Sequence, residues 1–412
     1  MSERSNGAVI IQKEENKPRL VGISAAGVAV VIVLWLRWSG VRAGIWADLD
    51  VYVQGAQALV KGVPLYEPRY GALPFTYPPF AALIFTPLHL LSSTGARGVF
   101  TVGSLVSYLL AVGVCGWRLR LPWKLVALMT LAGLALEPVV RTILLGQVNF
   151  YLMAAVVVDC LLLRSSRRGW LVGLAAGVKL VPSVFVVYYA LQRDWRSLLR
   201  AACGFLVTVG LGAIAAPKDS LGYWRGGLFG MSHFGQLAVV DGKNQSLIGL
   251  LVRISQDPSP LLLGALVASA SGLALGVAAA HRQLRVGDDV AALTSVAIGG
   301  LLASPLSWTH HWVWIVPAIM VLVAQRRLLM AWLLGSVFAT GSMWWVTLRP
   351  SQESLTPLQQ FACATYVAAG TGLVAWWAFG AGGNSGPPLP PRNESGHEVH
   401  GPVTMEPLRE GP

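Results

Sequence analysis

WLVGLAAGVKLVPSVFVVYYAL, residues 170–191, is the segment that decides how this chain folds. It is apolar and long enough to cross a bilayer, but the proline at position 182 interrupts it. Basic clusters flank it on both sides, namely Arg164, Arg167 and Arg168 before it and Arg193, Arg196 and Arg200 after it. Basic residues collect on the cytoplasmic side of membrane proteins. One crossing cannot place both clusters there, so we predict two short helices that meet at Pro182.

The composition of the chain also indicates a membrane protein. Of its 412 residues, 54% are hydrophobic and 12% are charged, and the mean hydropathy is +0.59. A soluble domain carries about 25% charged residues. Sixteen tryptophans exclude a disordered chain. We assign the net charge of +12 to cytoplasmic loops, not to nucleic-acid binding, and expect an all-α, multi-pass protein of the plasma membrane.

Apolar runs divide the chain into membrane-spanning segments. Ten are expected, at residues 20–36, 98–117, 125–140, 148–163, 198–216, 260–280, 290–303, 312–324, 328–347 and 358–380. With the helical pair, the bundle has about ten to twelve transmembrane helices. We expect a cytoplasmic N-terminal tail over residues 1–19, a transmembrane domain over 20–380 and a disordered cytoplasmic tail over 381–412.

The distribution of basic residues predicts the orientation. If Pro79–Leu91 dips into the outer leaflet without crossing, 19 of the 31 basic residues lie inside. Both termini are then cytoplasmic, and four polar segments share the extracytoplasmic face: residues 40–78, 141–149, 217–258 and 304–311. Polar groups gathered on one face of a bundle predict a site there.

The first outer loop contains Asp48-Leu49-Asp50-Val51-Tyr52. Asp48 or Asp50 could cap an amphipathic helix over Val51–Val60. An Asp-x-Asp metal motif of nucleotide-sugar transferases is a second interpretation, but such motifs sit in soluble α/β domains, for which the chain has no room. The third is a catalytic carboxylate that takes a proton from an acceptor hydroxyl as general base.

A second polar group is the corner Ser304-Pro305-Leu306-Ser307-Trp308-Thr309-His310-His311. Two of the chain's seven histidines are adjacent here. The corner could be part of an interfacial aromatic belt. Adjacent histidines on a helix point in different directions, which argues against a dinuclear metal site. One imidazole could instead bind a phosphate or orient a carboxylate.

Amides and one lysine complete the candidates. Gln147 and Asn149 begin a span and could cap it or bind sugar hydroxyls, and Asn244 in the large outer loop could do the same. Lys179 lies near the break in the helical pair, and an intramembrane lysine is expensive enough to predict a function. Asp159 could be its partner. We rank Lys179 below the outer-face residues, because its segment enters from the cytoplasmic side.

Six segments in order resemble glycosyltransferase family 87. They are Asp48 to Tyr52 with Gly62 to Tyr66, Phe75 to Phe80, Gly146 to Asn149, Lys179 to Pro182, Asn244 to Leu251, and Ser304 to His311. This resemblance, over about residues 40–330, implies a GT-C-type membrane enzyme with an extracytoplasmic active site. It implies an inverting transfer of mannose from polyprenyl-phosphate mannose to a glycolipid or lipoglycan in an α-(1→2) linkage. Asp48 matches the family's catalytic aspartate, and Asp50 falls on its variable position.

On that resemblance, Asp48 deprotonates the acceptor, and His310 or His311 with Arg141 neutralises the leaving phosphate. Gln147, Asn149 and Asn244 hold sugar hydroxyls. The remaining candidates for substrate contact are Asp50, Tyr52, Tyr77, Lys179 and Ser304. A phosphate leaves without protonation by a second acid, unlike the leaving group of a glycosidase. The scheme requires no metal and no cofactor.

Two other classes of protein remain open. A secondary transporter would show an internal repeat and broken helices near the midplane of the membrane. The chain shows no repeat, and the break at Pro182 alone favours a transporter. A membrane scaffold without chemistry would tolerate changes at Asp48 and His310.

Overall fold

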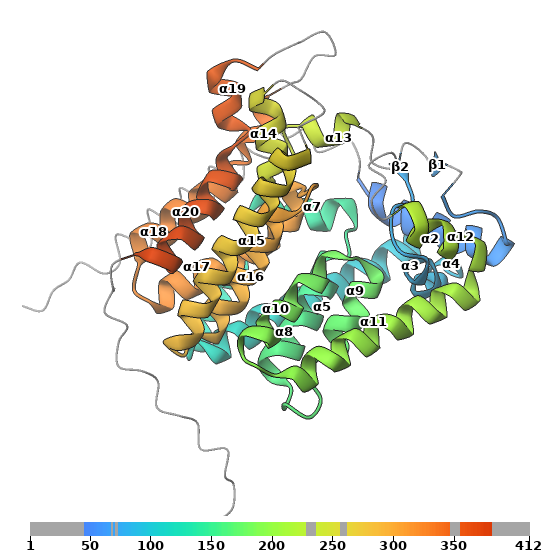
Figure 1. The fold of residues 1–412 in the computed structure, drawn as a ribbon, viewed down its shortest axis with the longest axis horizontal. Coiled ribbons are helices and arrows are strands. Elements are labelled where there is room, and N and C mark those ends of the chain that lie inside the picture. Colours follow the sequence, from blue (N-terminus) through green and yellow to red (C-terminus); the bar gives the residue numbers. More distant parts are fainter. Residues whose placement is uncertain are drawn as a thin grey trace, which may run out of the picture.

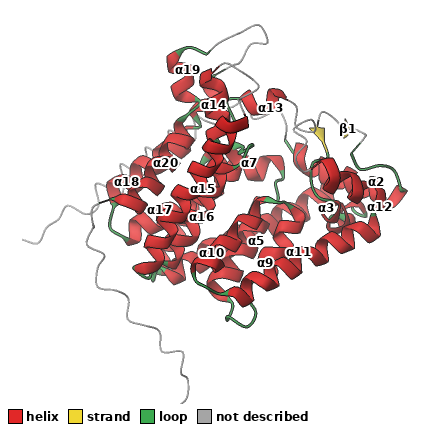
Figure 2. Ribbon diagram, viewed as in Figure 1, coloured by secondary structure: helices red, strands yellow, loops and turns green. Residues whose placement is uncertain are grey.

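The computed structural model describes residues 45–66, 69–70, 73–227, 236–255, 262–346 and 355–380. This part of the chain is helical except for loops and one antiparallel hairpin, β1 (Arg69–Tyr70) with β2 (Leu73–Pro74) (Figure 2). The predicted all-α architecture is confirmed. The expected span at residues 20–36 and the tails at 1–19 and 381–412 lie outside the described residues.

The helices fall into two groups (Figure 1). The first group is α2 (Ala47–Lys61), α3 (Pro79–Ile84), α4 (Thr86–His89), α5 (Ser93–Arg118), α6 (Trp123–Gly133), α7 (Glu137–Leu145), α8 (Asn149–Val157), η1 (Val158–Leu162), α9 (Trp170–Val178), η2 (Val181–Phe185), α10 (Val186–Leu191), α11 (Trp195–Ala215), α12 (Pro217–Gly222) and η3 (Tyr223–Gly227). The second is α13 (Gln236–Val240), α14 (Leu247–Ser255), α15 (Leu262–Arg285), α16 (Asp289–Ala303), η5 (Thr309–Trp314), α17 (Ile315–Ala324), α18 (Leu328–Thr340), η6 (Ser342–Trp345), α19 (Pro357–Ala362) and α20 (Thr365–Phe379). Helix α7 lies between the groups and contacts α2, η5 and α18.

Fewer spans are continuous helices than the apolar runs predict. Among the described residues four helices are long and apolar enough to cross a membrane: Ser93–Arg118, Trp195–Ala215, Leu263–Arg285 and Leu328–Trp345. The pair α6 and α7 makes a fifth, bent by 66°. Four more apolar helices have 10–17 residues. Breaks divide the runs into pieces shorter than the roughly 20 residues of a crossing, so the ten to twelve expected spans are not all continuous.

The helical pair predicted at residues 170–191 is present. Helix α9 ends at Val178, and Lys179 has extended backbone angles (φ −149°, ψ 131°). The break therefore precedes Pro182, which lies inside η2. Arg200 Nη1 donates to the carbonyl oxygens of Ser165, at 2.8 Å, and Arg168, at 3.4 Å. These bonds join the chain before the pair to the chain after it, so both basic clusters lie at one end of the molecule.

Two other expectations about local structure need correction or gain support. Arg141 was expected in a polar turn, but it lies inside α7, and the turn itself is limited to residues 146–148. The bend in this apolar run lies between α6 and α7, earlier than expected, so the residues after the bend, Arg141 among them, continue as helix.

Pro79–Leu91 forms two short helices, α3 and α4, that pack against α2. Each of the two helices is shorter than the roughly 20 residues that a crossing needs.

Close packing holds the second group of helices together. Helices α15 and α16 approach so closely that a Cβ on Gly276 would lie 2.6 Å from the Cα of Gly299. Small residues permit such approach between membrane helices, where dispersion contacts replace the hydrophobic effect. A smaller apolar cluster, around Leu49, Tyr52 and Phe100, holds α2 against α3 and α5, and α2 also contacts the hairpin. This cluster positions the first candidate segment.

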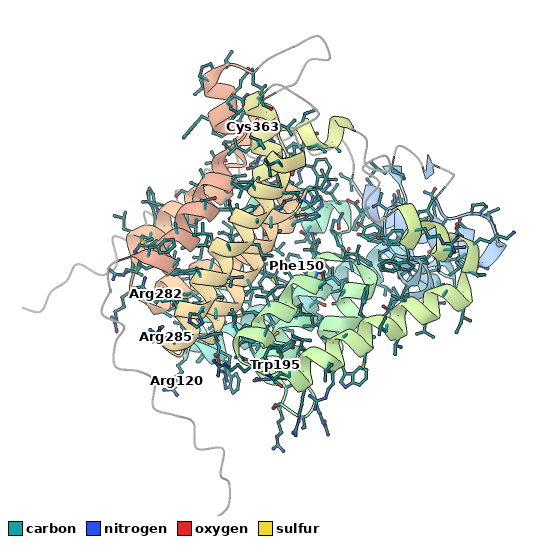
Figure 3. The ribbon with its side chains drawn as sticks, in the orientation of Figure 1. Arg120, Phe150, Trp195, Arg282, Arg285 and Cys363 are labelled. Carbon is teal, nitrogen blue, oxygen red and sulfur yellow. The ribbon has the colours of Figure 1, made fainter. Side chains whose placement is uncertain are left out.

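The molecule has one basic end. Figure 3 shows Arg120, Arg282 and Arg285 with Trp195 at its lower end, and Cys363 at the opposite end. Arg118 pairs with Asp289 at the start of α16. In the same orientation α13 and the hairpin lie in the upper half of the view, and α2 lies at the right, below the hairpin (Figure 1). These elements therefore lie away from the labelled basic residues.

Candidate active site

Helix α2 separates the two aspartates of the first segment. The helix begins at Ala47, earlier than expected, and its N-cap Trp46 provides no side-chain cap. Neither aspartate caps a helix over Val51–Val60. Asp50 makes an exposed ion pair with Arg97 at 3.5 Å. Asp48 is half-buried on another face and lies near Gln147.

The turn after α7 holds Gln147 next to α2. Gly146 ends α7 with a left-handed backbone (φ 67°), and a Cβ there would lie 2.6 Å from the Cβ of Leu49. Only glycine permits this approach and this angle together. The Trp46 N–H donates to the Leu144 carbonyl at 2.8 Å, which ties the start of α2 to the end of α7.

Two tyrosines extend the contact between Asp48 and Gln147. The Tyr52 hydroxyl donates to Oε1 of Gln147 at 3.0 Å and lies 2.9 Å from the Tyr77 hydroxyl. Tyr52 follows Asp48 by one helical turn, so both side chains occupy the same face of α2. Both tyrosines are buried. The candidates Asp48, Tyr52, Tyr77 and Gln147 therefore lie together.

Lys179 belongs to this site, contrary to its low rank. Its Nζ lies 3.2 Å from Asn149 Oδ1 and 3.1 Å from His311 Nε2, and 5.7 Å from the centre of the Tyr77 ring. Asp159 is not its partner, because that carboxylate accepts the Val172 N–H at 2.8 Å near the start of α9. The backbone reverses at Lys179, which brings the apex of the pair to the segments that carry Asn149 and His311. The side from which its segment enters the membrane was therefore the wrong basis for ranking Lys179.

The histidine corner is held by its backbone. The His310 carbonyl accepts hydrogen bonds from Asn149 Nδ2 at 2.7 Å and from the Thr142 hydroxyl at 3.1 Å. Asn149 does not cap α8, since the two ends of its side-chain amide contact His310 and Lys179. Within the described structure His310 Nε2 has no partner, and its side chain is only 9% exposed. This imidazole is buried with an unused ring nitrogen beside the cluster.

Protonation states follow from these contacts. Burial raises the pKa of Asp48 to about 6, and the hydrogen bond from Gln147 and the charge of Lys179 oppose that rise. A carboxylate with this pKa is ionised at neutral pH yet more basic than an exposed one, as general-base catalysis requires.

The contact with Lys179 determines the tautomer of His311. A lysine ammonium can only donate, so His311 Nε2 is the acceptor. His311 is then neutral, with its proton on Nδ1.

A cavity opens beside this polar cluster. About 470 Å³ of space not occupied by atoms, open solvent included, lies between its walls. Lys179, Asn149 and His311 provide polar lining. Its other walls are apolar: Leu152, Met153, Val156, Val181, Pro182, Val184, Phe185, Ala297, Leu301, Val313 and Trp314. A site with one cationic side and long apolar walls suits an amphiphile with an anionic head.

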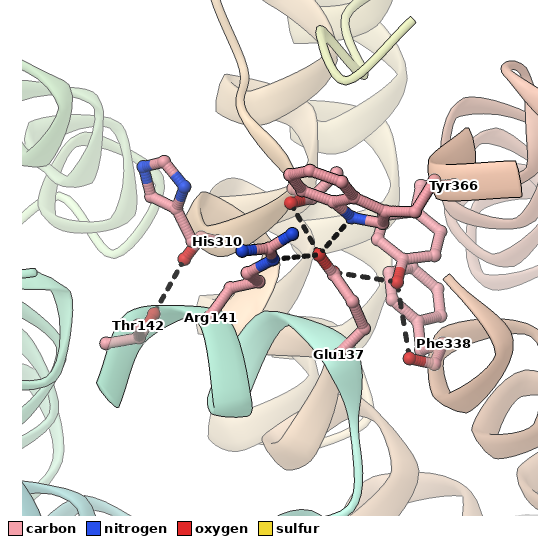
Figure 4. A network of polar contacts seen from close by, with 8 residues as sticks. Glu137, Arg141, Thr142, His310, Phe338 and Tyr366 are labelled. Atoms are coloured by element: carbon pink, nitrogen blue, oxygen red, sulfur yellow. Dashed lines mark hydrogen bonds and ion pairs between the residues drawn. The ribbon is translucent and has the colours of Figure 1, made fainter. Parts of the chain in front are cut away.

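A second polar network surrounds Glu137, which the sequence analysis missed (Figure 4). Its carboxylate is fully buried and accepts hydrogen bonds from Thr309 and Trp344, both at 2.7 Å, and from Tyr366 at 3.0 Å. Arg141 lies 4.0 Å from it and stacks on Trp344 at 3.5 Å from the ring centre. Arg141 therefore belongs to this network. The signal was available, because a carboxylate within an apolar run is uncommon.

Two further candidates are engaged by the chain itself. Asn244 accepts the Ser307 N–H at 2.9 Å, and its Nδ2 donates to the Val239 and Pro305 carbonyls, both at 3.1 Å. Ser304 donates its hydroxyl to the Leu306 carbonyl at 2.8 Å. Both side chains brace the corner, and the structure does not bring them to Asp48. Both residues are polar, as a substrate contact requires, but the sequence does not reveal that backbone groups of the loops take up their hydrogen bonds.

Metal ligands do not gather in the described ranges: no group of three or more His, Cys, Asp or Glu side chains there could hold an ion. The site consists of one carboxylate, one ammonium, two imidazoles, two amides and two phenols. This set can abstract a proton and bind an anion. It provides those two functions a short distance apart, with an apolar cavity next to the anion-binding groups.

Comparison with known proteins is consistent with this chemistry. The model of glycosyltransferase family 87 matches residues 75–305. A polyprenol-phosphate-mannose-dependent alpha-(1-2)-phosphatidylinositol mannoside mannosyltransferase of Mycobacterium tuberculosis is 34% identical, over 86% of this chain and 87% of that protein. The protein with this name from Mycolicibacterium smegmatis is 35% identical, over 84% and 85%. A pentamannoside mannosyltransferase of M. smegmatis is 33% identical, over 74% and 76%. No solved structure matches the chain.

Proposed function

The chain belongs to glycosyltransferase family 87, and from this premise we propose that it transfers mannose from polyprenyl-phosphate mannose to a phosphatidylinositol mannoside or a related lipoglycan through an α-(1→2) bond. The names of the relatives supply the donor and the acceptor. The comparisons do not favour a transporter. The observation that carries the proposal is that Lys179, whose charge acts on Asp48, contacts His311, and that Lys179 and His311 both line the cavity.

The proposed reaction is a single displacement. The acceptor hydroxyl attacks C1 of the mannosyl group and loses its proton to the Asp48 carboxylate. The bond between C1 and the phosphate oxygen breaks, and the phosphate keeps the electron pair. Lys179 and one imidazole meet the charge that develops on that oxygen, and no proton donor is needed for a leaving group this weakly basic. Attack opposite the leaving phosphate inverts the configuration at C1.

The cavity suits the proposed donor. Its apolar walls from α8, η2 and α16 would take the first isoprene units, and Lys179 with His311 would take the phosphate. The mannosyl group would then point toward Gln147 and Asp48. Arg141 was expected to share the phosphate, but its stacking on Trp344 favours a role in holding the corner.

We also propose that the site faces the extracytoplasmic side and that both termini are cytoplasmic. The support is the basic end seen in Figure 3 and the joined flanks of the helical pair. Basic loops remain on the cytoplasmic side. Asp48 and the hairpin lie toward the other end, where a lipid-linked sugar and a glycolipid are available.

Purified protein in liposomes tests the function directly. Labelled mannose should pass from polyprenyl-phosphate mannose to a phosphatidylinositol mannoside, and nuclear magnetic resonance of the product should show an α-(1→2) bond. Nucleotide-linked mannose should give no product. Movement of the intact donor across the bilayer without a new glycosidic bond would instead establish a transporter.

A further inference from the structure

Helix α7 is hydrogen-bonded to the histidine corner at two successive residues of the corner. Near the start of α7, the Glu137 carboxylate accepts the Thr309 hydroxyl at 2.7 Å. Near its end, the Thr142 hydroxyl donates to the carbonyl oxygen of His310 at 3.1 Å. Glu137 and Thr142 are five residues apart, which separates them by about 7.5 Å along the axis of an α-helix. Two bonds at this spacing hold both the position and the direction of the chain where η5 begins.

The carboxylate of Glu137 is itself held by two further elements (Figure 4). Trp344 of η6 donates to Oε1, the oxygen that Thr309 also contacts, at 2.7 Å. The Tyr366 hydroxyl of α20 lies 3.0 Å from Oε2, and its ring stacks on Phe338 with ring centres 3.9 Å apart. A fully buried carboxylate is costly unless its oxygens are bonded in this way. Glu137 is therefore a fixed point to which Thr309 is attached.

The corner needs such a fixed point because its own secondary structure is weak. Thr309 is the first residue of η5, a 3-10 helix, and hydrogen bonds in such helices have poorer geometry than those in an α-helix. Trp308, which precedes it, provides no side-chain cap. Trp312 within η5 departs from helical backbone angles (φ −78°, ψ 21°). The bond to Glu137 supplies an anchor at the start of η5 that the helix does not supply itself.

These anchors do not use the Nε2 atom of the His310 ring. Its carbonyl oxygen also accepts a hydrogen bond from Asn149 Nδ2 at 2.7 Å. Nε2 of the ring has no hydrogen-bond partner in the part of the chain that the structure describes, although the side chain is buried. The His310 ring lies edge to face with that of His311, with ring centres 4.7 Å apart, and His311 contacts Lys179. One buried ring nitrogen is thus left for a ligand beside the cationic wall of the cavity.

We propose that Glu137 is a positioning residue that, through Thr309, holds the His310 imidazole where it meets the phosphate of the donor. The inference rests on the proposed function, in which that phosphate binds beside the corner. Glu137 does not touch the substrate in this arrangement. It acts on the reaction by keeping the corner in one place while the His310 ring is turned to the ligand.

Thr309→Val tests the inference, because valine keeps the shape of threonine and removes only the hydroxyl. The bonds of Trp344 and Tyr366 to Glu137 remain, so the variant should fold. We expect kcat/KM for transfer from polyprenyl-phosphate mannose to fall about three- to tenfold, as loss of one hydrogen bond implies. Binding of polyprenyl phosphate, the lipid product, should weaken by a similar factor. Thr309→Ser keeps the hydroxyl and should restore both quantities.

A double-mutant cycle with His310→Ala shows whether Thr309 acts through this imidazole. If it does, Thr309→Val should lower kcat/KM less than about twofold further in the His310→Ala protein. Losses that multiply in full would overturn the inference, and so would a His310→Ala protein with unchanged kinetics. Thr130→Val is the matched control: it removes a buried hydroxyl that donates to the Val126 carbonyl at 2.8 Å within α6, and should leave kcat/KM unchanged.

Stability and binding measurements separate a positioning role from a structural one. A Thr309→Val protein that melts at a lower temperature but binds polyprenyl phosphate and transfers mannose as the wild type does would overturn the role of Glu137 and leave the proposed function intact. Wild-type protein that transfers no mannose would instead remove the proposed function, and the inference with it.

Discussion

Replacement of Lys179 by methionine should reduce kcat/KM strongly, because this lysine is a cation of the site that makes no ion pair in the described ranges. Methionine keeps an unbranched stem of similar length and removes the ammonium. In the part of the chain that the structure describes, the hydrogen-bonding partners of Nζ are neutral groups, Asn149 at 3.2 Å and His311 at 3.1 Å. None of the ion pairs in the described ranges involves Lys179. Its charge is therefore available to a bound phosphate.

The magnitude follows from that geometry. A hydrogen bond to a charged group contributes about 1.5–3 kcal/mol. Loss of one such contact to the phosphate therefore lowers kcat/KM by roughly 10- to 150-fold. Loss of the same charge also raises the pKa of Asp48, because Lys179 favours its ionised form. Assays on the alkaline side, where Asp48 is ionised in both proteins, separate the two effects.

Labelled transfer from polyprenyl-phosphate mannose, at matched protein levels in membranes, provides the measurement. Lys243→Met is the matched control, since Lys243 pairs with Asp241 at 3.3 Å and lies over Trp344. We expect the control to retain nearly full activity. A Lys179→Met protein that keeps more than about a tenth of wild-type kcat/KM on the alkaline side would refute a phosphate contact of this strength.

Four further outcomes are expected. Asp48→Asn should lose roughly 10²–10⁴ in rate while Asp50→Asn, which loses only an exposed ion pair, stays nearly active; the reverse result in the transfer assay would exchange their roles. Wild-type kcat/KM should fall as the pH decreases through about 6, because the folded-state pKa of Asp48 is raised and protonation removes the base; a rate that stays flat down to about pH 4 would contradict this. His310→Ala should lower turnover about tenfold or more if its unpartnered nitrogen meets the phosphate, and unchanged kinetics would leave it a packing residue. Reporter fusions after Arg168 should be cytoplasmic and fusions after Asp241 external, and an internal Asp241 would reverse the proposed side of the site.

The helical pair shows what charge patterns reveal. Two basic clusters around one apolar segment were enough to predict that the chain turns back within residues 170–191, and the bonds from Arg200 confirm it. The position of the break was harder to predict from the sequence. A proline alone did not locate it, because Pro182 fits the first turn of η2, where a missing N–H leaves no bond unmade.

The aspartates show what the sequence could not decide. Spaced two apart, they would share a face of an extended loop. In α2 the same spacing turns one about 200° from the other, so Asp48 meets Gln147 while Asp50 meets Arg97. The start of α2 at Ala47, with no side-chain cap, gave no sequence signal. Local structure therefore gives different neighbours to two aspartates that residue type alone leaves equivalent.

The sequence by itself determined the class of the protein and the segments that carry polar chemistry, the segment with the two candidate aspartates among them. Composition and periodicity are sufficient for these because lipid requires long apolar helices, and expensive polar residues within them stand out. Only the tertiary structure decided which polar groups meet. It brought Lys179 to Asn149 and His311, and it used Asn244 and Ser304 to brace a loop. Partners of a buried polar group come from segments far apart in the chain, and packing selects them.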